Sequence, residues 1–210
     1  GVSLDISEVP AAGISRIGAE DVANFSANGL VCKLVSTADC RSGDYSAYVQ
    51  PTLYPLGQPE AAVPANYNLI TLEGDISGRQ SFFGQGAGRY PTAYNVVQDC
   101  VDFLHGKGFY TAPGRKVAID NSVKLRYYVR TAQEDLWLKE NTEKHWAGAV
   151  VTKPVEVSVM HQWLKAHPEA FMAALATSSW VTVLLSSRAF RSANSGSKSM
   201  ERFKSLAISR

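Results

Sequence analysis

The chain has 210 residues, of which 45% are apolar and 19% are charged, and its formal net charge is +2. This composition is ordinary for a globular protein of one or two domains that bury their own cores. Because the net charge is small and both signs are scattered along the chain, we expect no nucleic-acid partner and no acidic membrane partner.

The cysteines, the histidines and one long uncharged stretch narrow the class of protein further. The three cysteines (Cys32, Cys40 and Cys100) include no CxxC pair, which predicts reduced, buried thiols in a cytoplasmic protein. Residues 170–187 carry no charge, but their serines and threonines favour a helix end followed by a buried strand over a membrane span. We expect no metal site, because no histidine has a cysteine or acidic partner at ligand spacing.

The first half of the chain is predicted to form one helix followed by strands. Acidic residues open the helix, and the pair Asn28 and Gly29 suits its C-cap. The sequence Glu-Gly-Asp at 73–75 interrupts an apolar run and predicts a hairpin or bulge. The helix is expected over 18–29, and the strands from 30, over 44–55, over 66–77 and over 79–86.

The next segment, TAYNVVQDCVDFLHGKG, predicts an amphipathic helix that ends at Gly106 to Gly108. Its apolar residues share one face at helical spacing: Ala93, Val96, Val97, Cys100, Val101 and Leu104. Beyond a stretch without apolar period, KLRYYVRT and VVTKPVEVSV predict strands, SVMHQWLKAH a helix with Ser158 as N-cap, and SWVTVLLSS a last strand. The Ser-rich end, from residue 192, is expected to be flexible at first and to finish in a short helix.

The segment GQGAGRYPTA raises the question of a dinucleotide site. Its glycines, Gly84, Gly86 and Gly88, have the spacing G-x-G-x-G, whereas a Rossmann fingerprint requires G-x-G-x-x-G and a second parallel strand after the helix. HGKGFYTAPG stands where that strand should be, so we do not assign a Rossmann fold here. Two interpretations remain: a tight turn from strand to helix, or a loop whose bare backbone and helix N-terminus approach a ligand.

The residues around this loop resemble the homoserine dehydrogenase family. The run LEGDISGRQSFFGQGAGRYPTAYNVVQDCVDF resembles a family segment with an EGD turn, a strand and GPGAGRxPTA opening a helix, with Gln85 in place of the usual proline. Upstream, AAGISRIGAEDVANFSANGLVCKLV and YVQPTLYP with Asn68 resemble further family segments in order and spacing. The resemblance covers residues 6–109, about half of the chain.

The resemblance implies a fold, a reaction and a cofactor. Members interconvert L-homoserine and aspartate 4-semialdehyde with NAD(P), which an N-terminal Rossmann domain binds, and the sheet of their catalytic domain forms a homodimer. Gly88 matches the position that contacts the cofactor near its nicotinamide end, and Gly86 and Ala87 beside it are weaker candidates for cofactor binding. The family's catalytic lysine and substrate-binding acids lie upstream of the matched segment, so we assign no catalytic residue and expect a fragment that is inactive alone.

These patterns lead us to expect an α+β sandwich, in which a mixed sheet is covered by helices and is followed by a smaller α+β domain. The catalytic and dimerisation domain would cover residues 1–110, a linker 111–121, and an ACT-like domain 122–210, whose core would contain Trp137, Trp146, Trp163 and Trp180. RTAQEDLWLKEN stands where ACT domains commonly have an Asp-x-x-Gly loop. Two roles of this domain therefore stay open: it binds an amino-acid effector, or it only pairs protomers. The alternative to an enzyme fragment is a non-catalytic module that binds amino acids or dimerises.

Overall fold

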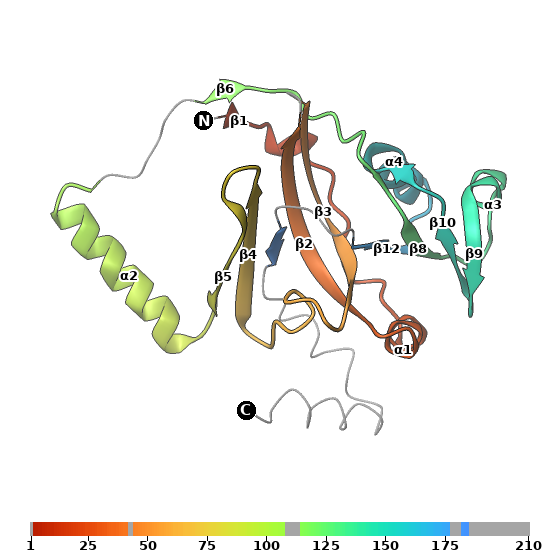
Figure 1. The fold of residues 1–210 in the computed structure, drawn as a ribbon, viewed down its shortest axis with the longest axis horizontal. Helices are drawn as coiled ribbons and strands as arrows, with labels where there is room; N and C mark the ends of the chain where they lie inside the picture. Colours follow the sequence, from red (N-terminus) through yellow and green to blue (C-terminus); the bar gives the residue numbers. More distant parts are fainter. Residues whose placement is uncertain (1, 42–43, 108–113, 177–181, 185–210) are drawn as a thin grey trace.

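A computed structural model describes residues 2–41, 44–107, 114–176 and 182–184 (Figure 1). In the first half, the elements are β1 (Val2–Ser3), a 3-10 helix η1 (Ile6–Glu8), α1 (Ala19–Ala27), β2 (Leu30–Arg41), β3 (Asp44–Pro55), β4 (Tyr67–Gly74), β5 (Gly78–Gln85) and α2 (Arg89–Leu104). In the second half, they are β6 (Arg115–Lys116), β7 (Lys124–Leu125), β8 (Tyr127–Arg130), α3 (Leu136–Asn141), β9 (Thr142–Trp146), β10 (Ala149–Thr152), β11 (Val155–Glu156), α4 (Val157–Ala166), β12 (Phe171–Leu175) and β13 (Thr182–Leu184).

Two long hairpins form the first half of the sheet. β2 and β3 pair antiparallel from Leu30 opposite Pro55 to Arg41 opposite Asp44, and β4 pairs antiparallel with β5. Gly78, with φ of +63°, lies at the turn between β4 and β5, a conformation that glycine adopts without steric cost. These findings confirm the predicted strands and the predicted hairpin after Glu73.

The second half contains a βαββαβ unit. Its elements follow in the order β8, α3, β9, β10, α4 and β12, and its strands lie side by side in the order β12-β8-β10-β9. The short strand β11, between β10 and α4, pairs with β7 in a separate sheet. Each neighbouring pair is antiparallel. This is the topology of ferredoxin-like α+β units, in which two helices cover one face of a four-stranded antiparallel sheet.

The two halves share one mixed sheet of nine strands, ordered β5-β4-β13-β2-β3-β12-β8-β10-β9. They meet at two places: β12 pairs parallel with β3, with Ala174 opposite Thr52, and β13 pairs antiparallel with both β2 and β4. The mixed α+β class is therefore confirmed, while the division into domains at 111–121 stays a prediction.

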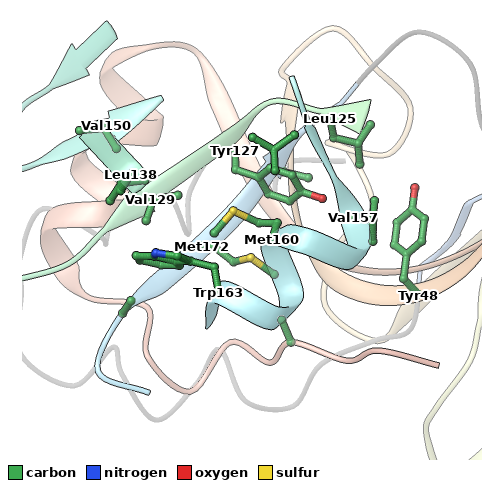
Figure 2. Close-up of a cluster of buried hydrophobic side chains, with 14 residues drawn as sticks. Tyr48, Leu125, Tyr127, Val129, Leu138, Val150, Val157, Met160, Trp163 and Met172 are labelled. Carbon is green, nitrogen blue, oxygen red and sulfur yellow. The ribbon is translucent and has the colours of Figure 1, made fainter. Parts of the chain in front are cut away.

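A large apolar cluster fills the space between the second-half sheet and α4 (Figure 2). Tyr127 and Val129 of β8 pack there against Met160 of α4 and Met172 of β12, and all four are buried. A second cluster lies on the opposite face, where Phe25 of α1 meets Tyr128 edge to face at 4.9 Å between ring centroids. Because residues of α1 and β8 share this core, the halves are packed against each other.

Several sequence expectations need correction. The N-cap of α4 is Glu156 and not Ser158, because the helix begins two residues earlier than expected, at Val157. Phe171–Leu175 forms β12 rather than a helix end, since it pairs on both sides within the sheet. Cys32 is buried as expected, but Cys40 and Cys100 are exposed, and all three are free thiols.

Other expectations are met or lie outside the described residues. Trp163 is buried, and Trp137 and Trp146 pack partly buried against the core clusters. Trp180 and the segment from residue 192 lie outside the described residues. Among the described helices, none has the length and apolar character to cross a membrane.

Candidate functional site

The glycine loop, residues 84–88, joins the outer strand β5 to the N-terminus of α2. Gly84 and Gln85 still belong to β5, whereas Gly88 is the N-cap of α2 with φ of +131° and ψ of +158°. Residues other than glycine rarely adopt such a φ, so the backbone conformation at position 88 requires a glycine. The structure therefore confirms that this segment turns tightly from a strand into a helix.

The loop is fixed by the residues that lead into β4. The N–H of Gly86 donates to the carbonyl oxygen of Asn66 at 3.0 Å, and Nδ2 of Asn66 donates to the carbonyl oxygen of Ala87 at 2.5 Å. Tyr67 stacks on Phe83 with 4.9 Å between ring centroids and accepts a hydrogen bond from Nε2 of Gln85 at 3.1 Å. Sequence reasoning missed Asn66, because it lies 22 positions before Gly88 and reaches the loop only through the pairing of β4 with β5.

Gly86 has a packing role inside the chain. A Cβ atom at this position would lie 1.6 Å from Nδ2 of Asn68, which is far closer than atoms can approach. The space beside Gly86 is thus already filled by Asn68, whereas a Cβ on Gly88 would meet its nearest atoms at an ordinary 3.5 Å. Of the three predicted cofactor contacts, Gly88 has the more open surroundings.

The first turn of α2 presents free backbone donors. Thr92 makes the first helical hydrogen bond, from its N–H to the carbonyl oxygen of Gly88 at 3.1 Å, and Pro91 has no N–H. The N–H groups of Gly88, Arg89 and Tyr90 have no acceptor within the described part of the chain. Such groups attract an oxygen acceptor, and the helix dipole adds to that attraction.

The apolar face of α2 is exposed. None of its residues is buried, and Figure 1 shows the helix extending away from the sheet. At helical spacing its apolar side chains span roughly half of the circumference, which is wider than a surface helix needs for a single contact. They are Tyr90, Ala93, Tyr94, Val96, Val97, Cys100, Val101, Phe103 and Leu104.

Buried polar groups elsewhere hold the halves together. Asp21 of α1, fully buried, accepts hydrogen bonds from Oη of Tyr128 and from Nε of Arg130, each at 2.8 Å. His161 of α4 contacts Oε1 of Gln50 at 3.0 Å, and burial with the charge of Lys165 lowers the pKa of His161 to about 4. Because each group is buried and bonded within the fold, we assign these clusters to stability.

A shallow cavity of about 190 Å³ lies apart from the glycine loop. It is bounded by residues 13–16 and by the segment from Leu164 to Met172, and Arg16 is its charged residue. The described residues contain no group of three or more histidine, cysteine or acidic side chains that could hold a metal ion. The glycine loop and this cavity are therefore the two places where we consider a ligand.

Comparison with known proteins supports the sequence resemblance. The model of the homoserine dehydrogenase family matches residues 1–101. Homoserine dehydrogenase of Bacillus subtilis is 36% identical over 100 residues, covering 48% of this chain and 23% of that protein. Homoserine dehydrogenase of Mycobacterium tuberculosis is 39% identical over 129 residues, covering 56% of this chain and 29% of that protein.

Solved structures extend the likeness in fold beyond residue 101. Homoserine dehydrogenase of Thiobacillus denitrificans matches 80% of this chain and 48% of its own with a TM-score of 0.58 at 22% identity. The enzyme of S. aureus matches 83% of this chain and 49% of its own with a TM-score of 0.53 at 23% identity. At these identities the likeness establishes the fold.

Together, the fold and the loop define an α+β protein in which a glycine turn carries an outer strand into a helix with free N-terminal donors. Through residues 1–101 the chain belongs to the homoserine dehydrogenase family. It spans about a quarter of the length of the curated relatives it matches, from 23% to 29% in the two named above.

Proposed function

We propose that this chain is the catalytic and dimerising part of a homoserine dehydrogenase, which interconverts L-homoserine and aspartate 4-semialdehyde in the pathway to threonine and methionine. The observation that carries the proposal is the family match over residues 1–101, which contains the whole glycine loop and most of α2. The names of the relatives describe the same activity in those proteins.

The cofactor in this proposal is NAD(P), which supplies the acceptor or donor of hydride. The surroundings of Gly88 fit it, because the residue has no side chain and lies at a helix N-terminus with free donors. Gly86 and Ala87 would contribute only backbone atoms, and Asn68 already fills the space beside Gly86. The loop would therefore bind and orient one end of a cofactor held mainly by another part of the protein.

This role does not include acid-base chemistry. Residues 84–92 contain no histidine, lysine, cysteine or acidic side chain, which are the usual general acids and bases. Loss of positioning and of proton transfer can each reduce a rate by orders of magnitude. We therefore expect the isolated chain to be inactive. The exposed apolar face of α2 supports the view that a further part of the protein covers it.

A homodimer would form on the outer face of the sheet. Ile70 and Phe82 lie opposite each other on β4 and β5 and are 40% and 56% exposed, and Leu72 beside them is 45% exposed. A continuous apolar surface of this kind is typical of an interface. Size-exclusion chromatography at two concentrations should show a dimer that Phe82→Asp weakens, and a monomer at both concentrations would contradict the homodimer.

The second half would form an ACT-like domain that binds an amino-acid effector. Its βαββαβ order and strand order support this proposal, and the cavity at Arg16 offers a guanidinium to a carboxylate. The same features fit a non-catalytic amino-acid-binding module, which is the second candidate function. Calorimetric titration with threonine and related amino acids tests binding, and the absence of heat and of a thermal shift at millimolar ligand would count against both versions.

The enzymatic proposal is tested with the chain alone and with a complete protein. Homoserine-dependent formation of NADPH should be absent with the isolated chain, even at high enzyme concentration. Turnover by the isolated chain would overturn the expectation of inactivity. The catalytic proposal itself requires turnover once the missing part is supplied.

A further inference from the structure

The contacts of Asn66 extend the proposed function to a residue outside the glycine loop. Asn66 binds two successive loop residues with two different groups: its main-chain carbonyl accepts from Gly86, and its side-chain amide donates to Ala87. We call these two hydrogen bonds the Asn66 clasp. The side-chain amide of asparagine carries two N–H donors close to the main chain, so it can donate to the carbonyl oxygen of a neighbouring segment.

The turn that carries Asn66 is itself held in an unusual conformation. Ala65 has φ of +36°, a region that residues with a side chain seldom occupy. The N–H of Tyr67 closes the turn by donating to the carbonyl oxygen of Pro64 at 2.9 Å. Strain of this kind persists where the surrounding structure fixes the chain, and it concentrates at positions with a functional task.

The clasp sets the direction of the next peptide group. The peptide between Ala87 and Gly88 is trans, so its C=O and N–H point in opposite directions. Because the amide of Asn66 holds the carbonyl oxygen of Ala87, the N–H of Gly88 must point away from Asn66. The side-chain amide of Asn66 therefore fixes the position of the loop and also the direction of the Gly88 N–H.

We infer that Asn66 is a positioning residue, which turns the Ala87–Gly88 peptide so that the Gly88 N–H joins the free donors of Arg89 and Tyr90 toward a bound oxygen acceptor. This inference rests on the proposed function, because the acceptor is an oxygen atom of the dinucleotide. A purely structural fastening would hold the loop without affecting how tightly it binds the cofactor.

The test compares two substitutions at Asn66 with a matched control in the full 210-residue chain. Asn66→Ala removes the side-chain donor without adding charge, and Asn66→Asp removes it while keeping the shape. Asn95→Ala makes the same truncation on the exposed side of α2, where the structure gives the side chain no hydrogen bond within the described residues. Amide hydrogen exchange and NADPH titration are followed by NMR for residues 84–92.

Both Asn66 variants lose the side-chain bond to Ala87 but keep the main-chain acceptor of the Gly86 N–H. In the free chain the loop should therefore open more often, so exchange of the Gly86 amide should speed by roughly tenfold, whereas Asn95→Ala should leave it unchanged. Unchanged exchange in both variants would overturn the clasp, whatever the cofactor does. In the titration, NADPH should shift the Gly88 amide of the unsubstituted chain, and the Asn66 variants should need about tenfold more NADPH for the same shift.

An equal NADPH response in the Asn66 variants and the unsubstituted chain would show that the clasp is structural only, which overturns the positioning role. A chain whose residues 84–92 do not respond to millimolar NADPH would instead contradict the proposed cofactor contact, and the positioning inference would fall with it. A titration with pyrophosphate identifies the acceptor, since a matching shift of the Gly88 amide would assign it to a phosphate oxygen.

Discussion

Gly88 combines a positive φ with the N-cap of α2, a helix that has no buried residue. Because α2 is not buried, strain introduced at Gly88 should appear as local opening of the helix rather than as global unfolding. Gly88→Ala should therefore speed amide exchange of Thr92, whose N–H is bonded to Gly88. Gly84→Ala is the control, because its added Cβ meets nothing within 4 Å. Equal exchange of Thr92 in both variants would contradict the strain at Gly88.

His161 links the stability of the fold to pH. Its pKa is lowered to about 4 in the folded chain by burial and by Lys165, whereas an unfolded histidine titrates near 6.5. Below pH 6.5 the unfolded state binds a proton that the folded state does not, so stability falls as the pH falls from 6.5 to about 4. The loss from this group amounts to about 3 kcal/mol at pH 4.

Urea denaturation between pH 7 and pH 4 measures this effect. His161→Gln should flatten the decline of the unfolding free energy, because glutamine does not titrate. His145→Gln, at an exposed histidine, should leave the decline as it is. A decline that is equally steep in the two variants would show that other groups cause the acid sensitivity.

At the scale of the element, α2 and α4 have similar amphipathic sequences and opposite surroundings. Met160 of α4 is fully buried in the core of Figure 2, whereas Val97 of α2 is 61% exposed. Met160→Ala should lower the free energy of unfolding by about 2–5 kcal/mol. Val97→Ala should change it by less than about 0.5 kcal/mol in urea denaturation of the isolated chain. A large loss from Val97→Ala would mean that α2 is packed after all.

The sequence predicted the elements of the first half well, because their signals are local. The cap of α1 at Asn28 and Gly29 and the turn at Gly78 depend on few neighbouring residues. The prediction from sequence was wrong where the pairing of strands determines the secondary structure. Phe171–Leu175 is an apolar run that forms a strand because it pairs with β3 and β8. The exposure of α2 could not be predicted from the sequence either. An apolar helix face indicates that something packs against it, but not whether the same chain or another polypeptide does so.

The candidate site shows the same division. The positive φ of Gly88 follows from a glycine placed between a predicted strand and a predicted helix. Asn66 lies 22 positions earlier in the chain, and only the pairing of β4 with β5 brings it to the loop. Its role was therefore beyond reach of local patterns.

At the scale of the whole molecule, two facts belong together. The chain spans only 23% of its relative from B. subtilis, and one of its own helices has an uncovered apolar face. Both are expected of a part that works when joined to a cofactor-binding part. The residues described here would then orient the cofactor, and the proton transfer would be carried out elsewhere in the protein.

The most direct measurement joins this chain to the upstream part of the B. subtilis enzyme, in place of that enzyme's own matched segment. We expect the chimera to form NADPH only when homoserine is present, and the isolated chain to form none. A chimera that is folded and binds NADP⁺, yet shows no homoserine-dependent turnover, would contradict the proposal that this chain serves a homoserine dehydrogenase.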